Sequence, residues 1–412
     1  YLKKFLVFCH RNSIINQWKK SSELLGLYLE DIESLNCQVQ NIKNLDGIIL
    51  TYQGATRNLN SIKEKIYKWH EDSFFSIADE VHHLGMNPDE PNSQAWGETF
   101  LQITRQSKLR IGLTGTPFRA DNLAFCAARK IKIKGEKDLI EQINPDLCIE
   151  PRELISVGDV RPLEFHFQDG WVEHRREGIP NIDVSPLSKE LRESWRARNL
   201  RRAIRISDSS CIAIQVILRA RKKLEKIRNY HKNAAGLVIG RDIEHATSIA
   251  NILKEDGDSV ELVHSQDNNS NKVLAGFESS KTKWLVSVDM CSEGFDAPRI
   301  RVVAYLTTVV TKSRFLQGIT RAVRVSDERT EVEGIPRSSS HVFAPADPLL
   351  IDYAREWSIS KPYLIKGEKP VSSLENNFGA TNGPLLPMET INDGVGALIK
   401  MRTAELPEFL KR

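Results

Sequence analysis

The sequence lacks the marks of a membrane-spanning, disulfide-stapled or zinc-finger protein. Its longest apolar stretch, residues 300–310, is interrupted by Arg301, Thr307 and Thr308 and is far shorter than the ~20 residues that a membrane-spanning helix needs. The six cysteines are scattered, with no Cys-x-x-Cys pair, so neither a disulfide framework nor a zinc finger is indicated. This cysteine usage favours a reducing cytoplasm, and nothing points to a membrane partner.

Two further features of the sequence concern ligands: the lack of a phosphate-binding loop and the uneven distribution of charge. No segment contains Gly-x-x-x-x-Gly-Lys-Ser/Thr, the loop that cradles phosphates in many nucleotide-binding proteins. The net charge is only +4, but it is unevenly distributed, because residues 171–235 hold 16 Lys and Arg against 7 Asp and Glu, a net charge of +9. Clustered positive charge favours an anionic polymer as a partner.

What the sequence does contain is typical of a globular α/β protein. Hydrophobic residues make up 40% and charged residues 27%, which excludes a disordered tail, a coiled-coil rod and a collagen-like fibre. Short apolar runs predict strands at residues 5–9, 47–50, 74–78, 110–113, 237–239, 260–263, 284–288, 301–306 and 342–344. Amphipathic stretches between them predict helices at 13–25, 62–70, 243–254 and 349–357. Uninterrupted apolar strands separated by helices indicate parallel sheets that are covered on both faces.

The alternation of strands and helices defines the expected domains. We expect a first α/β lobe at residues 1–150 and a second at 236–345. Residues 151–235, which are rich in Pro, Gly and basic helical segments, are expected to connect the lobes. Residues 346–412 are assigned as a C-terminal extension.

The strongest local motif is an apolar strand at 74–78 that ends in Asp79 and Glu80. Ligands bind at the carboxyl ends of strands in open parallel sheets. One carboxylate can hold the water shell of Mg²⁺, and a second can orient an attacking water. The alternative is a solvated strand end, because Asp-Glu pairs are common.

Two further motifs also follow predicted strands. Thr114 and Thr116 lie in a small-residue turn, where a threonine hydroxyl can bond to a neighbouring carboxylate and transmit its state; a plain strand-to-helix turn is the alternative. Gly294, which allows close backbone approach to a ligand, precedes Asp296, which can accept a ribose hydroxyl or a catalytic arginine.

The last motif places an amide and two guanidinium groups together. On one continuous helix Gln317, Arg321 and Arg324 would fall within a sector of ~60°, and arginine makes forked hydrogen bonds to phosphate oxygens. The alternative is an exposed amphipathic helix end.

The order and spacing of these motifs resembles the superfamily 2 helicases and translocases, most closely the branch that contains the helicase subunit of type III restriction enzymes. The matching segments are residues 8–18 (motif Ia), 51–53 (Ib), 79–82 (the Asp-Glu-x-His box), 114–117 (III), 236–253 (IV), 287–298 (V) and 317–324 (VI). Thr320 replaces the usual glycine of motif VI. The resemblance covers about residues 5–345, and 151–235 fit it only loosely.

The resemblance implies two RecA-like lobes with ATP in the cleft between them and a nucleic-acid strand across their top. It assigns Asp79 to Mg²⁺, Glu80 to the hydrolytic water, and Arg321 and Arg324 to the γ-phosphate. By position in the motifs, Gln317 joins the catalytic group, and Gly294 and Asp296 join the nucleotide-binding group. His82, Thr114 and Thr116 are the coupling residues. The nucleic-acid contacts are assigned to Arg11, Thr51, Tyr52, Gln53, Arg241 and Ser287.

The expected function is therefore that of an ATP-dependent DNA helicase or translocase, with ATP and Mg²⁺ as cofactors. Its partner would be single-stranded or duplex DNA, within a restriction or repair complex. The sequence Thr114-Gly115-Thr116-Pro117 and the Asp-Glu-Val-His box favour a DNA-acting branch. An RNA helicase and an ATPase-deficient nucleic-acid-binding scaffold are the alternatives.

The missing phosphate loop is the main departure from the family. In the family this loop precedes motif Ia, so we expect the numbered chain to be truncated before it and the first lobe to be incomplete. The 412 residues alone would then bind ATP poorly and hydrolyse it negligibly, whereas the full-length protein would be a DNA-stimulated ATPase.

Several other residues have two interpretations. Trp18 and Tyr52 could stack on bases, although core positions are more common for such aromatics. His82 and His83 have no third partner at a metal-like spacing, and His83 is expected at the surface. The basic stretch Arg192, Arg196, Arg198, Arg201, Arg202 and Arg205 could follow a phosphate backbone or form a solvated helix face balanced by Glu190 and Glu193.

Overall fold

The computed structural model describes twelve stretches of the chain: residues 4–32, 45–69, 74–85, 93–115, 130–134, 139–143, 145–175, 182–206, 211–288, 295–359, 364–365 and 398–401. The chain divides into two compact units. The first comprises Tyr1–Asp146 and Tyr363–Glu368, and the second comprises Leu147–Pro362 and Lys369–Arg412. No helix among these stretches has both the length and the apolar composition needed to cross a bilayer.

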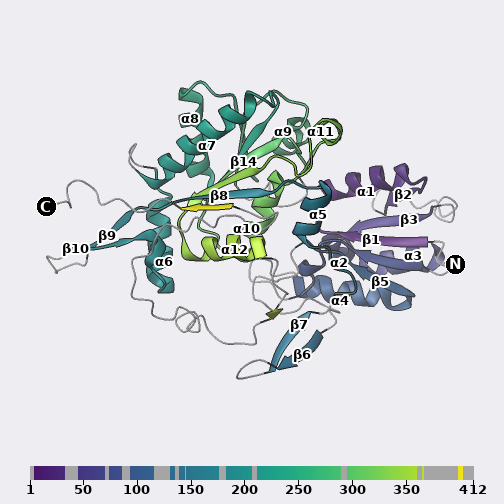
Figure 1. Ribbon diagram of the computed structural model, residues 1–412. Coiled ribbons are helices and arrows are strands. Elements are labelled where there is room, and N and C mark those ends of the chain that lie inside the picture. The colour runs from purple at the N-terminus through teal and green to yellow at the C-terminus, as the bar shows by residue number, and fades with distance from the viewer. Residues whose placement is uncertain are drawn as a thin grey trace. The chain divides into compact units, whose positions relative to one another are not determined.

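The first unit is built on a five-stranded parallel sheet with the order β2-β3-β1-β4-β5 (Figure 1). Its strands are β1 (Lys4–Cys9), β2 (Leu29–Asp31), β3 (Gly47–Thr51), β4 (Phe74–Ala78) and β5 (Leu109–Gly112). Every residue of β1 and β3 is buried, which is why these strands are continuous apolar runs. β1 and β4 are therefore inner strands, and their carboxyl ends lie side by side.

Helices cover both faces of this sheet (Figure 1). They are α1 (Asn12–Leu24), α2 (Tyr52–Arg57), α3 (Leu59–Trp69) and α4 (Ser93–Ile103), with short 3₁₀ turns η2 (Val81–His83) and η3 (Thr104–Gln106). Val7 packs toward Ile14 and Ile15 of α1, whereas Phe8, on the other face, meets Phe100 of α4 edge-on at a centroid distance of 5.0 Å. The alternation of side chains along β1 thus divides the core into two layers.

A small antiparallel sheet also belongs to the first unit. It has the order β16-β7-β6 and consists of β6 (Lys130–Lys134), β7 (Leu139–Ile143) and β16 (Leu364–Ile365). The last of these strands comes from the segment that the sequence analysis assigned to a C-terminal extension.

The second unit contains a seven-stranded parallel sheet with the order β12-β13-β11-β14-β15-β8-β17 (Figure 1). Its strands are β8 (Leu163–Gln168), β11 (Ala235–Gly240), β12 (Val260–Val263), β13 (Trp284–Ser287), β14 (Ile300–Leu306), β15 (Ser340–Pro345) and β17 (Leu398–Met401). Trp284 lies flat against Gly236, where an added Cβ would come within 2.1 Å of the indole ring. Glycine is therefore required at position 236.

Helices again cover both faces. α7 (Ile212–Arg228) and α8 (Ile243–Glu255) share one apolar cluster with β11, β13 and β14, while α10 (Lys312–Ile319) and α12 (Pro348–Ile359) pack on the other face (Figure 1). The remaining elements are α5 (Pro151–Val157), the hairpin β9 (Trp171–Arg175) and β10 (Ile182–Pro186), η4 (Leu187–Lys189), α6 (Glu193–Ala203), α9 (Ser270–Phe277), η5 (Thr320–Ala322) and α11 (Asp327–Val332).

The predicted α/β class with two parallel sheets is confirmed, and each of the nine predicted strands overlaps an observed one. The segment 151–235, expected as a connection, instead contributes β8 to the second sheet and α7 to its core. Leu224 of α7 is buried whereas Lys222 and Lys226 are exposed, so these two lysines lie on the outer face of the helix.

Candidate functional site

Asp79 follows the inner strand β4 and is held from three directions. The indole Nε1 of Trp18, on α1, donates to Asp79 Oδ2 at 2.8 Å. The backbone N–H of Glu80 donates to Oδ1 at 3.0 Å, and the hydroxyl of Tyr52, on α2, donates to the backbone carbonyl of Asp79 at 2.8 Å. The sequence did not predict the contact between Asp79 and Trp18, because 61 residues separate the two groups. Helix α1 thereby holds the carboxylate of Asp79, and α2 holds its backbone.

The Asp79 carboxyl group lies in an environment that suits a bound cation. Burial raises its pKa above the ordinary value, against the lowering effect of the hydrogen bonds from Trp18 and Glu80. A nearby positive charge would offset this cost of burying the ionised form. Carboxylate oxygens are the ligands that Mg²⁺ takes together with several waters, so this residue fits a magnesium-binding role.

Glu80 adopts a left-handed backbone conformation, with φ 50° and ψ 50°, and is the one non-glycine residue with positive φ in the described part of the chain. Such a conformation costs on the order of 1–3 kcal/mol and persists where the surroundings enforce it. Here the backbone N–H of Val81 is held by the carbonyl of Leu113 at 2.9 Å. The side chain of Glu80 is 27% exposed, so it is accessible to solvent in the turn that follows β4.

His82 joins the end of β4 to the segment that follows β5. Its Nδ1 lies 2.9 Å from Thr114 Oγ1 and 3.3 Å from Glu80 Oε2. The predicted coupling residues His82 and Thr114 are therefore in contact, within the first unit, and His82 also contacts the carboxylate of Glu80. Thr116, the third predicted coupling residue, lies outside the described residues.

The prediction that His83 lies at the surface is wrong. Its side chain is 3% exposed, and its ring stacks on that of His10 with a centroid distance of 3.9 Å and an interplanar angle of 9°. His10 directly follows β1, so the pairing of β1 with β4 brings together two imidazoles that are distant in the sequence.

The nucleic-acid residues predicted in the first unit follow β1 and β3 and lie at the same edge of the sheet as Asp79. Arg11 is half-buried and Gln53 is exposed. Thr51 caps α2 by accepting a hydrogen bond from the backbone N–H of Gly54 at 3.0 Å. Tyr52 is 1% exposed, which favours the core interpretation of this aromatic residue over base stacking.

In the second unit, Gln317 and Arg321 lie together near the end of α10. Arg321 Nε donates to the backbone carbonyl of Gln317 at 3.2 Å, and Nη1 donates to the carbonyl of Phe295 at 2.6 Å. Both side chains are buried. Gly318 lies between them in close contact with β11, because a Cβ there would come within 2.7 Å of the terminal Cδ1 of Ile239, which would have to shift.

Arg324 forms an ion pair with Asp296, so two predicted site residues meet in this unit. The predicted helical stripe is wrong in one respect: α10 ends at Ile319, a 3₁₀ turn covers 320–322, and Arg324 lies beyond both. The Arg324 side chain is 36% exposed, in contrast to the buried Arg321. Gly294 lies outside the described residues.

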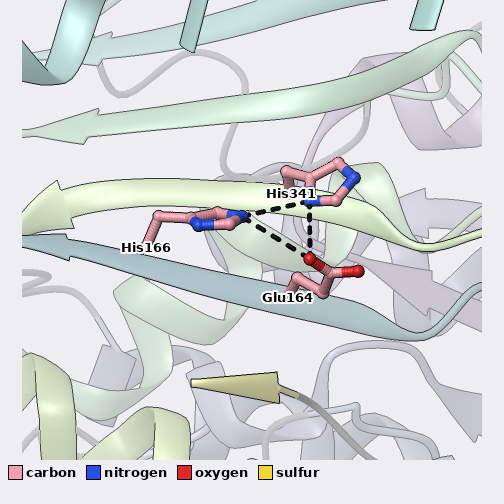
Figure 2. A group of neighbouring side chains, drawn as sticks. All are labelled: Glu164, His166 and His341. Atoms are coloured by element: carbon pink, nitrogen blue, oxygen red, sulfur yellow. Dashed lines mark hydrogen bonds and ion pairs between the residues drawn. The ribbon is translucent and has the colours of Figure 1, made fainter. Parts of the chain in front are cut away.

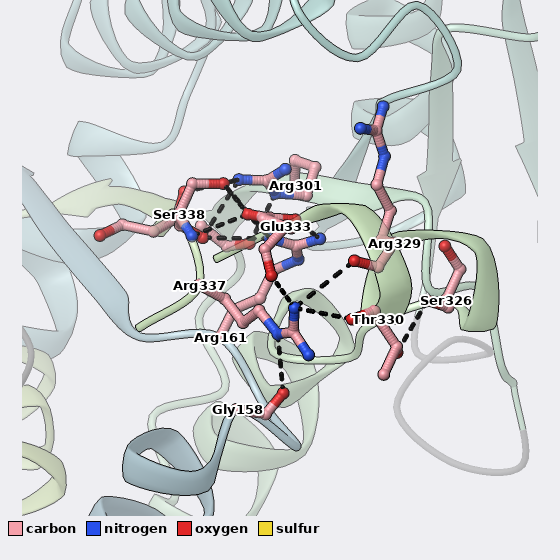
Figure 3. Close-up of polar contacts among 11 residues, drawn as sticks. Gly158, Arg161, Arg301, Ser326, Arg329, Thr330, Glu333, Arg337 and Ser338 are labelled. Carbon is pink, nitrogen blue, oxygen red and sulfur yellow. Dashed lines mark hydrogen bonds and ion pairs between the residues drawn. The ribbon is translucent and has the colours of Figure 1, made fainter. Parts of the chain in front are cut away.

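A polar network anchors the segment that carries Arg324 (Figure 3). The guanidinium of Arg161, at 2% exposure, donates to both carboxylate oxygens of Glu333 at 2.7 and 2.8 Å, and Arg337 Nε donates to the carbonyl of Gly158 at 3.0 Å. The backbone N–H of Arg161 also donates to the carbonyl of Val323 at 2.6 Å. The start of β8 thus positions the backbone immediately before Arg324.

The other nucleic-acid residues predicted in this unit follow β11 and β13. Arg241 Nε donates to Asp242, the residue that caps α8. Ser287 is fully buried, and its hydroxyl has no hydrogen-bond partner among the residues that the structure describes. Both residues lie at the carboxyl edge of the second sheet.

The basic stretch 192–205 is divided between structural and exposed arginines. Arg196 is buried and donates to Asp347 Oδ2 at 2.8 Å, so it links α6 to the residue that precedes α12 rather than facing solvent. Arg192 forms a forked pair with Glu190. The exposed members of the stretch are Arg192, Arg198, Arg201, Arg202 and Arg205.

Comparison with known proteins matches two family models to the chain. The model described as "Type III restriction enzyme, res subunit" matches residues 1–119, and the helicase conserved C-terminal domain matches residues 219–326. An uncharacterised protein of Mycobacterium leprae is 27% identical over 376 residues, covering 90% of this chain and 59% of the relative. One of Mycobacterium tuberculosis is 26% identical over 352 residues, covering 85% and 54%. The chain therefore spans somewhat more than half the length of these relatives.

A solved structure supports the fold. A fragment assigned as an HsdR subunit of a type I restriction enzyme from Vibrio vulnificus YJ016 aligns with a TM-score of 0.51 and 16% identity, covering 86% of this chain and 55% of that one. Likeness at this level of identity shows a shared fold alone.

Proposed function

We propose that the full-length protein is an ATP-driven motor of superfamily 2 that moves on DNA. The match of residues 1–119 to the res subunit of type III restriction enzymes and of residues 219–326 to the helicase C-terminal domain supports this proposal. The observation that carries this proposal is the arrangement after β4. There, an aspartate whose carboxylate is held by α1 and whose backbone is held by α2 precedes a glutamate in a strained turn. That glutamate contacts a histidine whose ring is hydrogen-bonded to Thr114.

In the first unit, Asp79 and Glu80 divide the work of hydrolysis. Asp79, held by Trp18, would orient the water shell of Mg²⁺; the ion supplies charge stabilisation to the phosphates when it is bound. Glu80 would accept a hydrogen bond from the attacking water and align it. The Glu80 side chain is partly exposed and contacts His82, so a water molecule can reach its carboxylate, as this role requires.

In the second unit, Arg321 and Arg324 supply positive charge to the transferred phosphate. Arg321 is already fixed by backbone carbonyls, which makes it a rigid donor. Arg324 is more exposed and is paired with Asp296, so it can exchange that carboxylate for a phosphate oxygen. Gln317, beside Arg321, would contribute an amide to the same group of donors.

His82 and Thr114 would report the state of the nucleotide to the nucleic acid. Movement of Glu80 during hydrolysis changes its contact with His82 and therefore the position of Thr114, which follows β5. Arg11 and Gln53, at the same edge of the sheet, would contact the DNA backbone together with Arg241 of the second unit.

The proposal is tested by the steady-state ATPase activity of the full-length protein, measured without nucleic acid and with single-stranded DNA, duplex DNA or RNA. We expect DNA to raise turnover and RNA to have a smaller effect. Stronger stimulation by RNA would assign the protein to RNA, and hydrolysis absent under every condition would leave a nucleic-acid-binding scaffold.

The exposed arginines of α6 are predicted to bind phosphates. Replacing Arg198 and Arg201 by glutamine should weaken DNA binding and reduce the slope of log affinity against log salt by about 0.7–0.9 for each arginine–phosphate interaction removed. The measurement is a DNA-binding titration of the full-length protein at several salt concentrations. Lys254→Gln with Lys272→Gln, on α8 and α9, is the control of equal charge change. An unchanged slope would show that α6 presents a solvated face.

A further inference from the structure

Three side chains of the second sheet bring potential metal ligands to one point (Figure 2). Glu164 and His166 belong to β8, and His341 belongs to the neighbouring β15. His166 Nε2 lies 3.1 Å from His341 Nδ1, and Glu164 Oε2 lies 3.4 Å from His341 Nδ1 and 3.8 Å from His166 Nε2.

The sheet itself produces this convergence. In the parallel pairing of β8 with β15, Glu164 is opposite His341 and His166 is opposite Phe343. Residues two apart on a strand point to the same face, so all three ligands share the face of the sheet on which α7 packs. Phe343 stacks on the ring of His166 at a centroid distance of 4.6 Å, which fixes the orientation of this imidazole. The cluster is thus held by strand register and ring packing.

The distances match the coordination geometry of a small divalent ion. A point equidistant from the three atoms lies about 2.0 Å from each, and Zn–N and Zn–O bonds are ~2.0–2.2 Å. In a tetrahedral site with such bonds, neighbouring ligand atoms are separated by about 3.3–3.4 Å, close to the separations seen here.

The ligand types are those that zinc takes. Two imidazole nitrogens and one carboxylate oxygen form the three-ligand set of many open zinc sites, in which water occupies the fourth position. Glu164 is 22% exposed and His166 18% exposed, so a water can reach the ion from that side. His341 is 5% exposed and provides the buried ligand. Without a metal, one imidazole can donate a hydrogen bond to the other. A bound metal would instead take a lone pair from each of the three ligand atoms.

We propose that Glu164, His166 and His341 bind one divalent transition-metal ion, with Zn²⁺ as the best-fitting ion. The ion joins β8 to β15. Because β8 begins where Arg161 anchors the segment before Arg324, the metal stabilises the strand pair that supports that segment.

The test is Zn²⁺ binding to the purified full-length protein, measured by competition with a chromophoric chelator after complete metal removal. The variants are Glu164→Gln and His166→Gln. The matched controls are Glu261→Gln and His264→Gln. Glu261 lies on the edge strand β12 and His264 directly follows it, and both are half-buried residues of the same unit that undergo the same chemical changes. Circular dichroism of each metal-free variant establishes that it is folded.

We expect one Zn²⁺ per chain at this site, an affinity at least 10-fold lower in each cluster variant, and wild-type affinity in the controls. Co²⁺ should give the intense visible absorption of a four-coordinate ion in the wild-type protein, and His166→Gln should lose it. Zn²⁺ affinity or Co²⁺ absorption that is unchanged in His166→Gln and Glu164→Gln would overturn the proposal.

A substitution that retains all three ligands provides an independent check. Lys223, on α7, is close enough to act electrostatically on both Glu164 and His341. Its positive charge opposes a cation, so Lys223→Gln should tighten Zn²⁺ binding several-fold at low ionic strength. An affinity unchanged or weakened by Lys223→Gln would contradict a cation at this position.

Discussion

Glu80→Gln in the full-length protein is expected to retain nucleotide binding and to lose about 10²–10⁴-fold in kcat, the range for a group that takes part in proton transfer or water alignment. Glutamine keeps the size of the side chain, and the strained backbone at position 80 is unaffected because neither residue is glycine. The substitution removes the carboxylate that can orient and polarise the attacking water. The measurement is steady-state turnover, together with the dissociation constant for ATP.

Glu98→Gln is the matched control for this experiment. Glu98 is an exposed glutamate of α4 in the same unit, so its substitution should leave kcat within about twofold of the wild type. Normal turnover in Glu80→Gln would contradict the proposal that Glu80 aligns the attacking water. Loss of ATP binding with unchanged kcat would instead give Glu80 a role in binding alone.

Arg324→Ala is expected to lower kcat by about 10³–10⁵-fold, the contribution of an arginine that stabilises the charge of a transferred phosphoryl group. The effect on nucleotide binding should be much smaller, because Arg324 is paired with Asp296 before it meets a phosphate. Single-turnover hydrolysis and equilibrium ATP binding, measured on the same variant, separate the two effects.

Arg329→Ala is a suitable control, because Arg329 lies on α11 only five residues further along the chain and carries the same charge. Its substitution should leave turnover close to that of the wild type. If Arg324→Ala weakened ATP binding and left maximal turnover intact, the proposed role of Arg324 in the chemical step would be rejected.

Most of the fold could be predicted because buried parallel strands are visible as continuous apolar runs. β1 and β14 are buried at every position, and both were predicted to within one residue at each end. β8 was missed because its sequence alternates, with Leu163, Phe165 and Phe167 directed into the core and polar residues between them. An alternating pattern is itself a strand signal, so a search for period-two segments would have found β8.

The candidate site was less predictable, since its contacts join distant segments. The pairing of Asp79 with Trp18 depends on how α1 packs beside β1, and the stacking of His83 on His10 depends on the register of β1 and β4. No local pattern encodes either contact. The expected stripe through Arg324 failed for a local reason: it assumed a continuous helix, whereas α10 ends at Ile319.

The central proposal is that Glu80 and Arg324 both act in the hydrolysis of ATP. Its most direct test is the turnover of the full-length double variant Glu80→Gln/Arg324→Ala beside the two single variants. Groups that act as one catalytic unit are strongly non-additive, so we predict that the double variant is no more than a few-fold slower than the slower single variant. A reduction equal to the product of the two single reductions would contradict this account.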